Sequence, residues 1–189
     1  MKVIKQSYEI MDNINGEEIL KKIERCGRTC YQSQDKITED SAKRFVAAII
    51  KRGHESVIEH VSVTVKLITN LRVLAEITRH RLASFSVESS RYVNYKDGLT
   101  FIQPCWLNDM TECPPVIQGL YTDRDYKWYN NCLKCEDLYK TEIENGAKPE
   151  EASNYLTKDT KTEIVMTADL REWRHIFKLR TAKAAHPQM

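Results

Sequence analysis

Two arginines and a histidine stand together at Arg79-His80-Arg81, and a segment with several serines follows as far as Arg91. Guanidinium groups are planar and donate paired hydrogen bonds that match phosphate oxygens. Serine hydroxyls and loop amides add neutral donors. The residue types therefore predict a phosphate-binding cradle. The alternative is a solvated helix end, where the helix dipole favours cations, and composition alone leaves both interpretations open.

A second group of chemically capable residues lies near the C-terminal end, between Asp169 and Gln188. In a helix over residues 169–180, Arg180 falls on the same stripe as Trp173, Ile176 and Phe177, which we expect to be buried. A guanidinium on a buried stripe must be paired or must face a ligand, because burying it alone is unfavourable. The alternative is an arginine that extends to solvent as the helix ends. The adjacent face carries Arg171, His175 and Lys178.

A third stretch, Gly53 to His60, contains His54 and Glu59. Taken singly, residues of these types are most often a helix end and a surface carboxylate. The pair Cys132-x-x-Cys135 has the spacing of half a zinc site, but no second such pair and no suitably spaced histidines accompany it. We expect two partly buried small residues on one side of a helix.

The elements that must position these residues follow from periodicity. We expect helices over about 15–28, 40–52, 70–80, 118–145, 149–156 and 169–180, and strands over 60–69, 91–95, 99–104 and 162–169. Asn15, Asp40, Asn70 and Asp169 stand where helix N-caps are expected. Residues 83–90 lack a helical period and are predicted to be a loop. Strands separated by helices without strict alternation indicate the α+β class.

The composition describes a globular chain of 189 residues with a formal net charge of +2. We expect a single domain over 1–189. The small net charge argues against a nucleic-acid partner, although a basic cluster beside many tyrosines keeps an RNA-binding module as an alternative. The sequence lacks a signal-peptide core and an apolar run of about 20 residues, so we expect a cytoplasmic protein, without a membrane span, whose cysteines are free thiols.

The three stretches together resemble the flavin-dependent thymidylate synthase family. Arg79-His80-Arg81, seven residues and then Ser89 match the signature RHR-x7-S of that family. His54-Glu55 followed by Glu59-His60 matches its earlier motif. Leu170-Arg171 followed by Leu179-Arg180 matches its last helix. The likeness extends from about residue 18 to the end of the chain, and the order of the stretches is that of the family.

The resemblance implies roles for individual residues. Arg180 is expected to bind the pyrimidine ring and stabilise negative charge that develops on it, His54 to lie near the flavin and the folate, and Ser89 to position the substrate. The positions implied to contact the flavin are Ser56, Glu59, Arg79, His80, Arg81, Arg171 and His175. Those implied to contact dUMP are Glu76, Arg79, Ser89, Ser90, Arg91 and Arg180.

The implied fold is a central, mostly antiparallel sheet flanked by helices, in a homotetramer whose active sites lie where subunits meet. The implied reaction is the reductive methylation of dUMP to dTMP by an FAD-dependent methyltransferase. Methylenetetrahydrofolate supplies the carbon and NADPH reduces the FAD. No cysteine nucleophile is required, which agrees with the absence of cysteine from residues 79–92.

Three positions depart from the family pattern. Ser153 replaces an arginine that contacts the phosphate of dUMP, Thr157 replaces a proline, and Asp169 replaces an asparagine. Relatives also continue beyond the position of Met189, so we expect either a truncated chain or one in which that further part is dispensable. Losing one charge-assisted hydrogen bond weakens binding by ~1.5–3 kcal/mol. A catalytically weakened flavin- and nucleotide-binding relative is therefore the alternative function.

Overall fold

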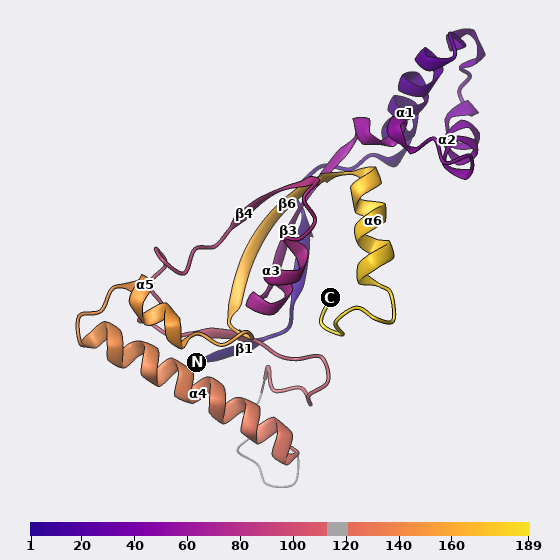
Figure 1. Cartoon of the computed structure of the whole chain (residues 1–189). Helices are drawn as coiled ribbons and strands as arrows, with labels where there is room; N and C mark the ends of the chain where they lie inside the picture. Colours follow the sequence, from indigo (N-terminus) through magenta and orange to yellow (C-terminus); the bar gives the residue numbers. More distant parts are fainter. Residues whose placement is uncertain (113–120) are drawn as a thin grey trace.

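The computed structural model describes residues 1–112 and 121–189 (Figure 1). Its centre is a four-stranded sheet in the order β2-β3-β6-β4. These strands are β2 (Ser7–Ile10), β3 (Ser62–Asn70), β6 (Lys161–Asp169) and β4 (Ala83–Val87). All neighbouring pairs are antiparallel. The α+β class and the mostly antiparallel sheet are thereby confirmed.

One face of the sheet is covered by two helices, α3 (Leu71–Ile77) and α6 (Leu170–Arg180) (Figure 1). Ile164 and Met166 of β6 are fully buried beneath them, together with Ile77 of α3 and Ile176 of α6. Every second residue of β6 is buried, as expected for a strand with one covered face. Both helices begin directly from a strand, and the side chains of Asn70 and Asp169 cap them by accepting backbone N–H bonds.

Beyond one end of the sheet lies a second core. The strand β1 (Lys2–Ile4) pairs in parallel with β5 (Thr100–Ile102). The long helix α4 (Asp123–Glu144) packs there with the short α5 (Pro149–Ala152) and the 3₁₀ turn η3 (Ser153–Tyr155). Phe101 and Tyr139 are completely buried between these elements. Tyr95 and Leu99, in the segment that leads from β4 to β5, and Leu156, which precedes β6, belong to the same core.

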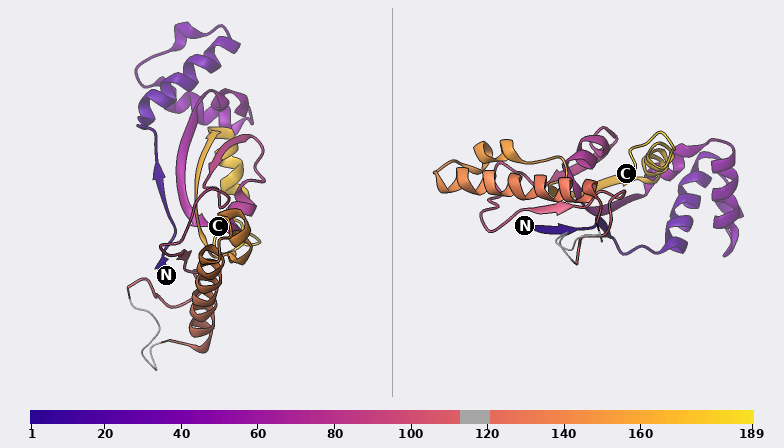
Figure 2. Two further views of the ribbon diagram at one scale, coloured as in Figure 1. Left: turned by 90° about the vertical axis from the view of Figure 1, so that its left-hand side faces the viewer. Right: turned by 90° about the horizontal axis from the view of Figure 1, so that it is seen from below.

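At the other end of the sheet a helical hairpin projects from the body (Figures 1 and 2). It consists of α1 (Gly16–Cys30) and α2 (Ser41–Lys51), joined through the 3₁₀ turn η1 (Gln34–Lys36). The following 3₁₀ turn, η2 (Glu55–His60), packs its Val57 and Ile58 into the hairpin core. The hairpin thereby positions the motif that contains His54 and Glu59.

Several predicted elements are confirmed, and others need correction. The helix expected over 118–145 covers residues 123–144, capped by Thr122, and residues 118–120 lie outside the described part. Asp40 precedes α2 but makes no capping hydrogen bond through its side chain. The segment 91–95, predicted to be a strand, begins in a turn and then has no regular structure; the N–H groups of Tyr92 and Val93 donate to the carbonyl of Ser89. The strands β1 and β2 were not predicted.

The most consequential correction concerns residues 83–90. They were predicted to be a loop, but residues 83–87 form β4, which pairs with β6 from Ala83 opposite Ala168 to Val87 opposite Ile164. Serines at alternate positions gave the segment a polar appearance. Backbone hydrogen bonds to β6 stabilise this strand, although its local sequence does not indicate one.

None of the described helices combines the length and the apolar character that a membrane-spanning segment requires.

The close approach of α1 and α2 provides a stability test. A Cβ added at Gly27 would lie 2.7 Å from the Phe45 ring and 3.0 Å from Ile49. Alanine in place of glycine gains about 1 kcal/mol of helix propensity, but overpacking costs about 1–3 kcal/mol. We expect Gly27→Ala to lower the free energy of unfolding by about 1 kcal/mol, measured by urea denaturation. Gly16→Ala, which meets open space, is the control, and a Gly27→Ala protein as stable as this control would contradict the packing.

Candidate active site

Arg180 is the centre of a hydrogen-bonded group between α3 and α6. Its Nε donates to Nε2 of His80 at 2.9 Å. One terminal nitrogen donates to Oε2 of Glu76 at 2.8 Å and the other to the Glu76 carbonyl at 2.6 Å. The Arg180 side chain is 18% exposed. The sequence interpretation of a paired, largely buried arginine is therefore correct, and extension to solvent is excluded.

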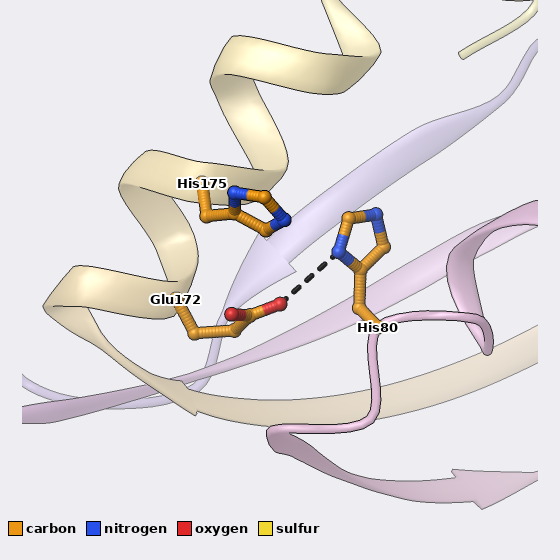
Figure 3. Close-up of side chains that lie close together, drawn as sticks. All are labelled: His80, Glu172 and His175. Atoms are coloured by element: carbon orange, nitrogen blue, oxygen red, sulfur yellow. Dashed lines mark hydrogen bonds and ion pairs between the residues drawn. The ribbon is translucent and has the colours of Figure 1, made fainter.

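His80 connects this arginine to the first turn of α6. Its Nδ1 lies 3.1 Å from Oε1 of Glu172 (Figure 3). His80 is 5% exposed and Glu172 is 6% exposed. The His80 ring also makes an edge-on contact with the ring of His175, with centroids 5.9 Å apart. His80 is held in place because its backbone N–H donates to the carbonyl of Ile77 at the end of α3.

Two open clefts adjoin this group and share Leu82, Glu172 and His175. The first, of about 600 Å³, is strongly basic and is lined by Arg79, His80, Arg81, Leu82, Glu172, His175, Leu179, Arg180, Ala182, Ala184 and Ala185. The second, of about 950 Å³, has mixed charge and is lined by Glu55, Glu59, Leu82, Asp169, Arg171, Glu172, Arg174, His175, Phe177 and Lys178. Together they form one hollow, and each of its two parts has a volume in the range of small-molecule pockets.

Ion pairs join the second cleft to η2. Arg171 donates to Glu59 at 2.5 Å, and Arg174 lies 3.2 Å from Glu55. The hydrogen bond from Arg171 to the Glu59 carboxylate raises the pKa of that guanidinium. These contacts fix the motif of residues 53–60 against the first turns of α6.

The remaining predicted residues of that motif lie outside both clefts. His54 is exposed, and its Nδ1 is 3.0 Å from the hydroxyl of Tyr31. Ser56 is exposed on η2. Neither lines the described hollow, so a single chain does not bring them to Arg180.

The two halves of the RHR-x7-S signature lie at opposite ends of β4. Before the strand, beside α6, stand Arg79, His80 and Arg81. After it stand Ser89, Ser90 and Arg91. The backbone N–H of Glu88, just before these last three, donates to the carbonyl of Glu163 near the start of β6. An extended strand rises about 3.3 Å per residue, so roughly 20 Å separate the two halves. The predicted cradle of adjacent arginines and serines is therefore wrong within one chain.

The loop after β4 has its own anchors. Glu88 accepts hydrogen bonds from the Tyr95 hydroxyl and from the Lys161 ammonium, each at 2.8 Å. Burial, followed by the bond to Glu88, raises the pKa of Tyr95. Arg91 is exposed and pairs with Glu150 at 3.3 Å. These contacts order the backbone that carries Ser89 and Ser90.

Within the described residues, one group of three potential metal ligands is found, formed by His80, Glu172 and His175. Arg180 Nε is always a donor, so Nε2 of His80 must present its lone pair. A neutral imidazole then carries its proton on Nδ1, the nitrogen that faces Glu172. That nitrogen has no lone pair for a cation, and Arg79, Arg81 and Arg180 surround the site. The hydrogen-bond pattern favours a polar network over a metal centre.

The Cys132 and Cys135 thiols are buried in the core formed with α4. Cys135 Sγ donates to the Tyr155 carbonyl, and burial raises the pKa of Cys132 and of Cys135. The interpretation as buried small residues on one side of a helix is confirmed.

Sequence reasoning missed Glu172 and Arg174, and it named Glu55 only as part of a motif, without a role. A signal for Glu172 was available, because it stands four residues before the buried Ile176 and so belongs to the predicted apolar stripe. Phe177, predicted to be buried, is 59% exposed; it lines the second cleft and stacks on Trp173. Helical spacing alone therefore did not show that Glu172 is buried and Phe177 is exposed.

Comparison with known sequences gives a consistent result. The sequence profile of the family described as thymidylate synthase complementing protein matches residues 10–189. The flavin-dependent thymidylate synthase of Pyrococcus furiosus is 29% identical over 162 residues, which are 84% of this chain and 62% of that protein. A probable flavin-dependent thymidylate synthase of Mycobacterium phage L5 is 30% identical over 174 residues, 88% of this chain and 70% of that protein. The chain thus spans about three fifths of the length of the Pyrococcus relative.

Solved structures show the same fold. Thymidylate synthase X of Helicobacter pylori, solved with FAD and dUMP, aligns with a TM-score of 0.72 at 20% identity, over 97% of this chain and 87% of that one. The UMP/dUMP methylase PolB of Streptomyces cacaoi, bound with 5-Br dUMP, aligns with a TM-score of 0.76 at 20% identity, over 100% of this chain and 86% of that one.

The buried thiols generate a chemical test. Because a thiolate is the reactive form and burial raises the pKa of Cys132 and Cys135, a variant that retains only this pair should react with a thiol reagent at pH 8 slowly, at the rate of unfolding. A variant that retains only the exposed Cys30 should react at once. Equal rates in the two native proteins would contradict the burial, and urea should make both fast.

Proposed function

This chain belongs to the thymidylate synthase complementing protein family, and we propose that it is a flavin-dependent thymidylate synthase, a methyltransferase that converts dUMP to dTMP. The carbon donor is methylenetetrahydrofolate and the final reductant is NADPH. The products besides dTMP are tetrahydrofolate and NADP⁺. The reaction takes place in the cytoplasm, where the thiols stay reduced. The observation that carries the proposal is the convergence of the RHR segment and the last helix on Arg180.

The basic cleft fits a phosphorylated cofactor. Arg79 and Arg81 are exposed on its rim, and neither has a carboxylate partner among residues 1–112 and 121–189. Unpaired guanidinium groups beside a cleft are suited to phosphate oxygens. We assign FAD to the joined clefts, held by Arg79, His80, Arg81, Arg171 and His175. Bound FAD, once reduced, supplies the hydride that completes the methyl group.

Arg180 acts on the pyrimidine ring. A guanidinium has five N–H groups, and the bonds to His80 and Glu76 use one on each nitrogen. One further N–H remains on each terminal nitrogen. Held on a fixed frame, these donors stabilise negative charge as it develops on the ring carbonyl, without reorganisation during the reaction. Glu76 orients the arginine, and we assign it a contact with the nucleotide.

The phosphate of dUMP is assigned to Ser89, Ser90 and Arg91. Because β4 separates them from Arg180 in one chain, we infer that they come from a neighbouring chain in a homotetramer. His54, Ser56 and Glu59 belong to the flavin and folate side of the same shared site. Binding phosphate requires Arg91 to leave Glu150, which costs little because an exposed ion pair contributes about 0–1 kcal/mol.

The three departures from the family pattern have local structural roles. Asp169 caps α6 by accepting from the Glu172 N–H at 2.8 Å, as an asparagine would. Ser153 donates to the Glu150 carbonyl and supplies no cation for phosphate. Thr157 accepts from the Asp159 N–H. The loss of the arginine at position 153 is the observation that favours the alternative, a weakened enzyme that binds flavin and dUMP.

A direct assay tests the function. The purified protein, reconstituted with FAD, should show flavin absorbance and release dTMP from dUMP, methylenetetrahydrofolate and NADPH. Arg180→Ala should retain flavin while kcat/KM for dUMP falls by about a hundredfold or more, since one preorganised charge is lost. A wild-type protein that binds FAD and dUMP without turnover would establish the weakened relative. A protein that cannot be reconstituted with FAD refutes the assignment.

Mixing variants tests whether the site is shared. Arg91→Ala and Arg180→Ala should each be nearly inactive. If the two residues of one site come from different chains, co-expression should restore about a quarter of wild-type activity. Each of the two chains that form a site then carries the intact residue with a probability of about one half. Co-expression that restores nothing would show that one chain supplies both. A double variant carrying both substitutions, co-expressed with either single variant, is the control and should stay inactive.

A further inference from the structure

An ordered series of hydrogen bonds runs from Glu172 through His80 to Arg180 and Glu76. Its direction follows from one group that cannot change roles, because the Arg180 Nε–H is always a donor. His80 must therefore be an acceptor at Nε2, and a neutral imidazole that accepts at one nitrogen is a donor at the other. The bond between His80 and Glu172 is consequently an Nδ1–H donation to the carboxylate.

We propose that Glu172 is a positioning residue for Arg180, which acts by holding His80 in the Nδ1–H tautomer. The proposal deepens the function assigned above and rests on it for the role of Arg180. Glu172 need touch neither cofactor nor substrate for this purpose. Its carboxylate fixes the proton on one side of the imidazole, and the lone pair on the other side fixes the plane of the guanidinium.

Because His80 and Glu172 are buried, the orientation of Arg180 depends on which nitrogen of His80 carries the proton. The His80 side chain is 4% exposed and that of Glu172 is 7% exposed, so solvent is a poor substitute for either partner. Without the carboxylate, the proton on Nδ1 loses its acceptor. Moving the proton to Nε2 relieves that loss but sets an N–H against the Arg180 Nε–H. In the first case the imidazole loses the contact that fixes its plane, and in the second the guanidinium loses its bond at Nε, so that only Glu76 holds it, through its terminal nitrogens.

A neighbouring histidine does not replace Glu172 in this role. His175 contacts the His80 ring edge-on (Figure 3) but is itself exposed. The only carboxylate hydrogen-bonded to His80 among the described residues is Glu172. Glu172 lies in the first turn of α6, whose N-terminus Asp169 caps, and its carboxylate is 3.1 Å from the imidazole.

The experiment compares Glu172→Ala, Glu172→Gln and a matched control in the FAD-loaded protein. Glu172→Ala should lower kcat/KM for dUMP by about tenfold to a hundredfold, the effect of losing one hydrogen bond that orients a charged group, with flavin content unchanged. Glu172→Gln retains an oxygen that accepts from Nδ1–H, so it should stay within about threefold of the wild type. Glu24→Ala removes another buried helical carboxylate, far from the site in α1, and should change thermal stability but not kcat/KM.

A spectroscopic measurement tests the tautomer independently of activity. With ¹⁵N-labelled histidine, His80 should show a protonated Nδ1 and an unprotonated Nε2 in the wild type and in Glu172→Gln. Glu172→Ala should shift the proton toward Nε2. A wild-type spectrum with the proton on Nε2 overturns the proposal, whatever the enzyme does.

The kinetic outcomes separate this proposal from the function beneath it. A wild type without turnover refutes the assigned function, while the nitrogen spectrum still decides the tautomer. An active wild type with an equally active Glu172→Ala variant overturns the positioning role. A Glu172→Gln variant as impaired as Glu172→Ala also overturns it, since the acceptor oxygen would then be insufficient.

Discussion

A largely buried guanidinium is the constraint on which the site depends. Arg180 sits where α6 ends over the covered face of the sheet, and a charge in that position is unfavourable unless its donors are satisfied. Glu76 and His80 accept one hydrogen bond from each of its three nitrogens, from α3 and the residues just after it, and leave two N–H groups for a ligand. The two helices cover the same face because β3 leads into α3 and β6 leads into α6, and the strands are neighbours. The topology thus brings segments about 100 residues apart into one hydrogen-bonded group.

The central sheet separates the two halves of the RHR-x7-S signature as well as supporting α3 and α6. Its edge strand β4 carries the RHR segment at one end and the serine-rich loop at the other. Each end is anchored to a different core, the first by α3 and α6 and the second by α4 and α5. A signature that is contiguous in sequence is therefore divided in space within one chain.

The ion pairs between η2 and α6 are more exposed to solvent than the hydrogen bonds of Arg180. Arg171 and Glu59 are both substantially exposed, and pairs of that kind add little to stability. Their effect is to hold η2 beside the second cleft, which has mixed charge. A ligand that competes for Arg171 would release Glu59, so this part of the cleft adjusts to its occupant more readily than the buried group at Arg180.

The sequence by itself determined the long alternating strands, the caps at Asn70 and Asp169, and the residue types around the site, because these depend on local periodicity and local hydrogen bonds. It also determined the family, since the three motifs match in residue type and order. Only the tertiary structure decided that β4 is a strand, that Phe177 is exposed, and that Glu172 faces His80. Those outcomes depend on partners distant in sequence. Pairing with β6 orders a polar segment, and packing against the sheet decides which side of α6 is buried. Nor does spacing along the chain reveal which nitrogen of His80 carries a proton, because that is set by the donor that Arg180 brings to it.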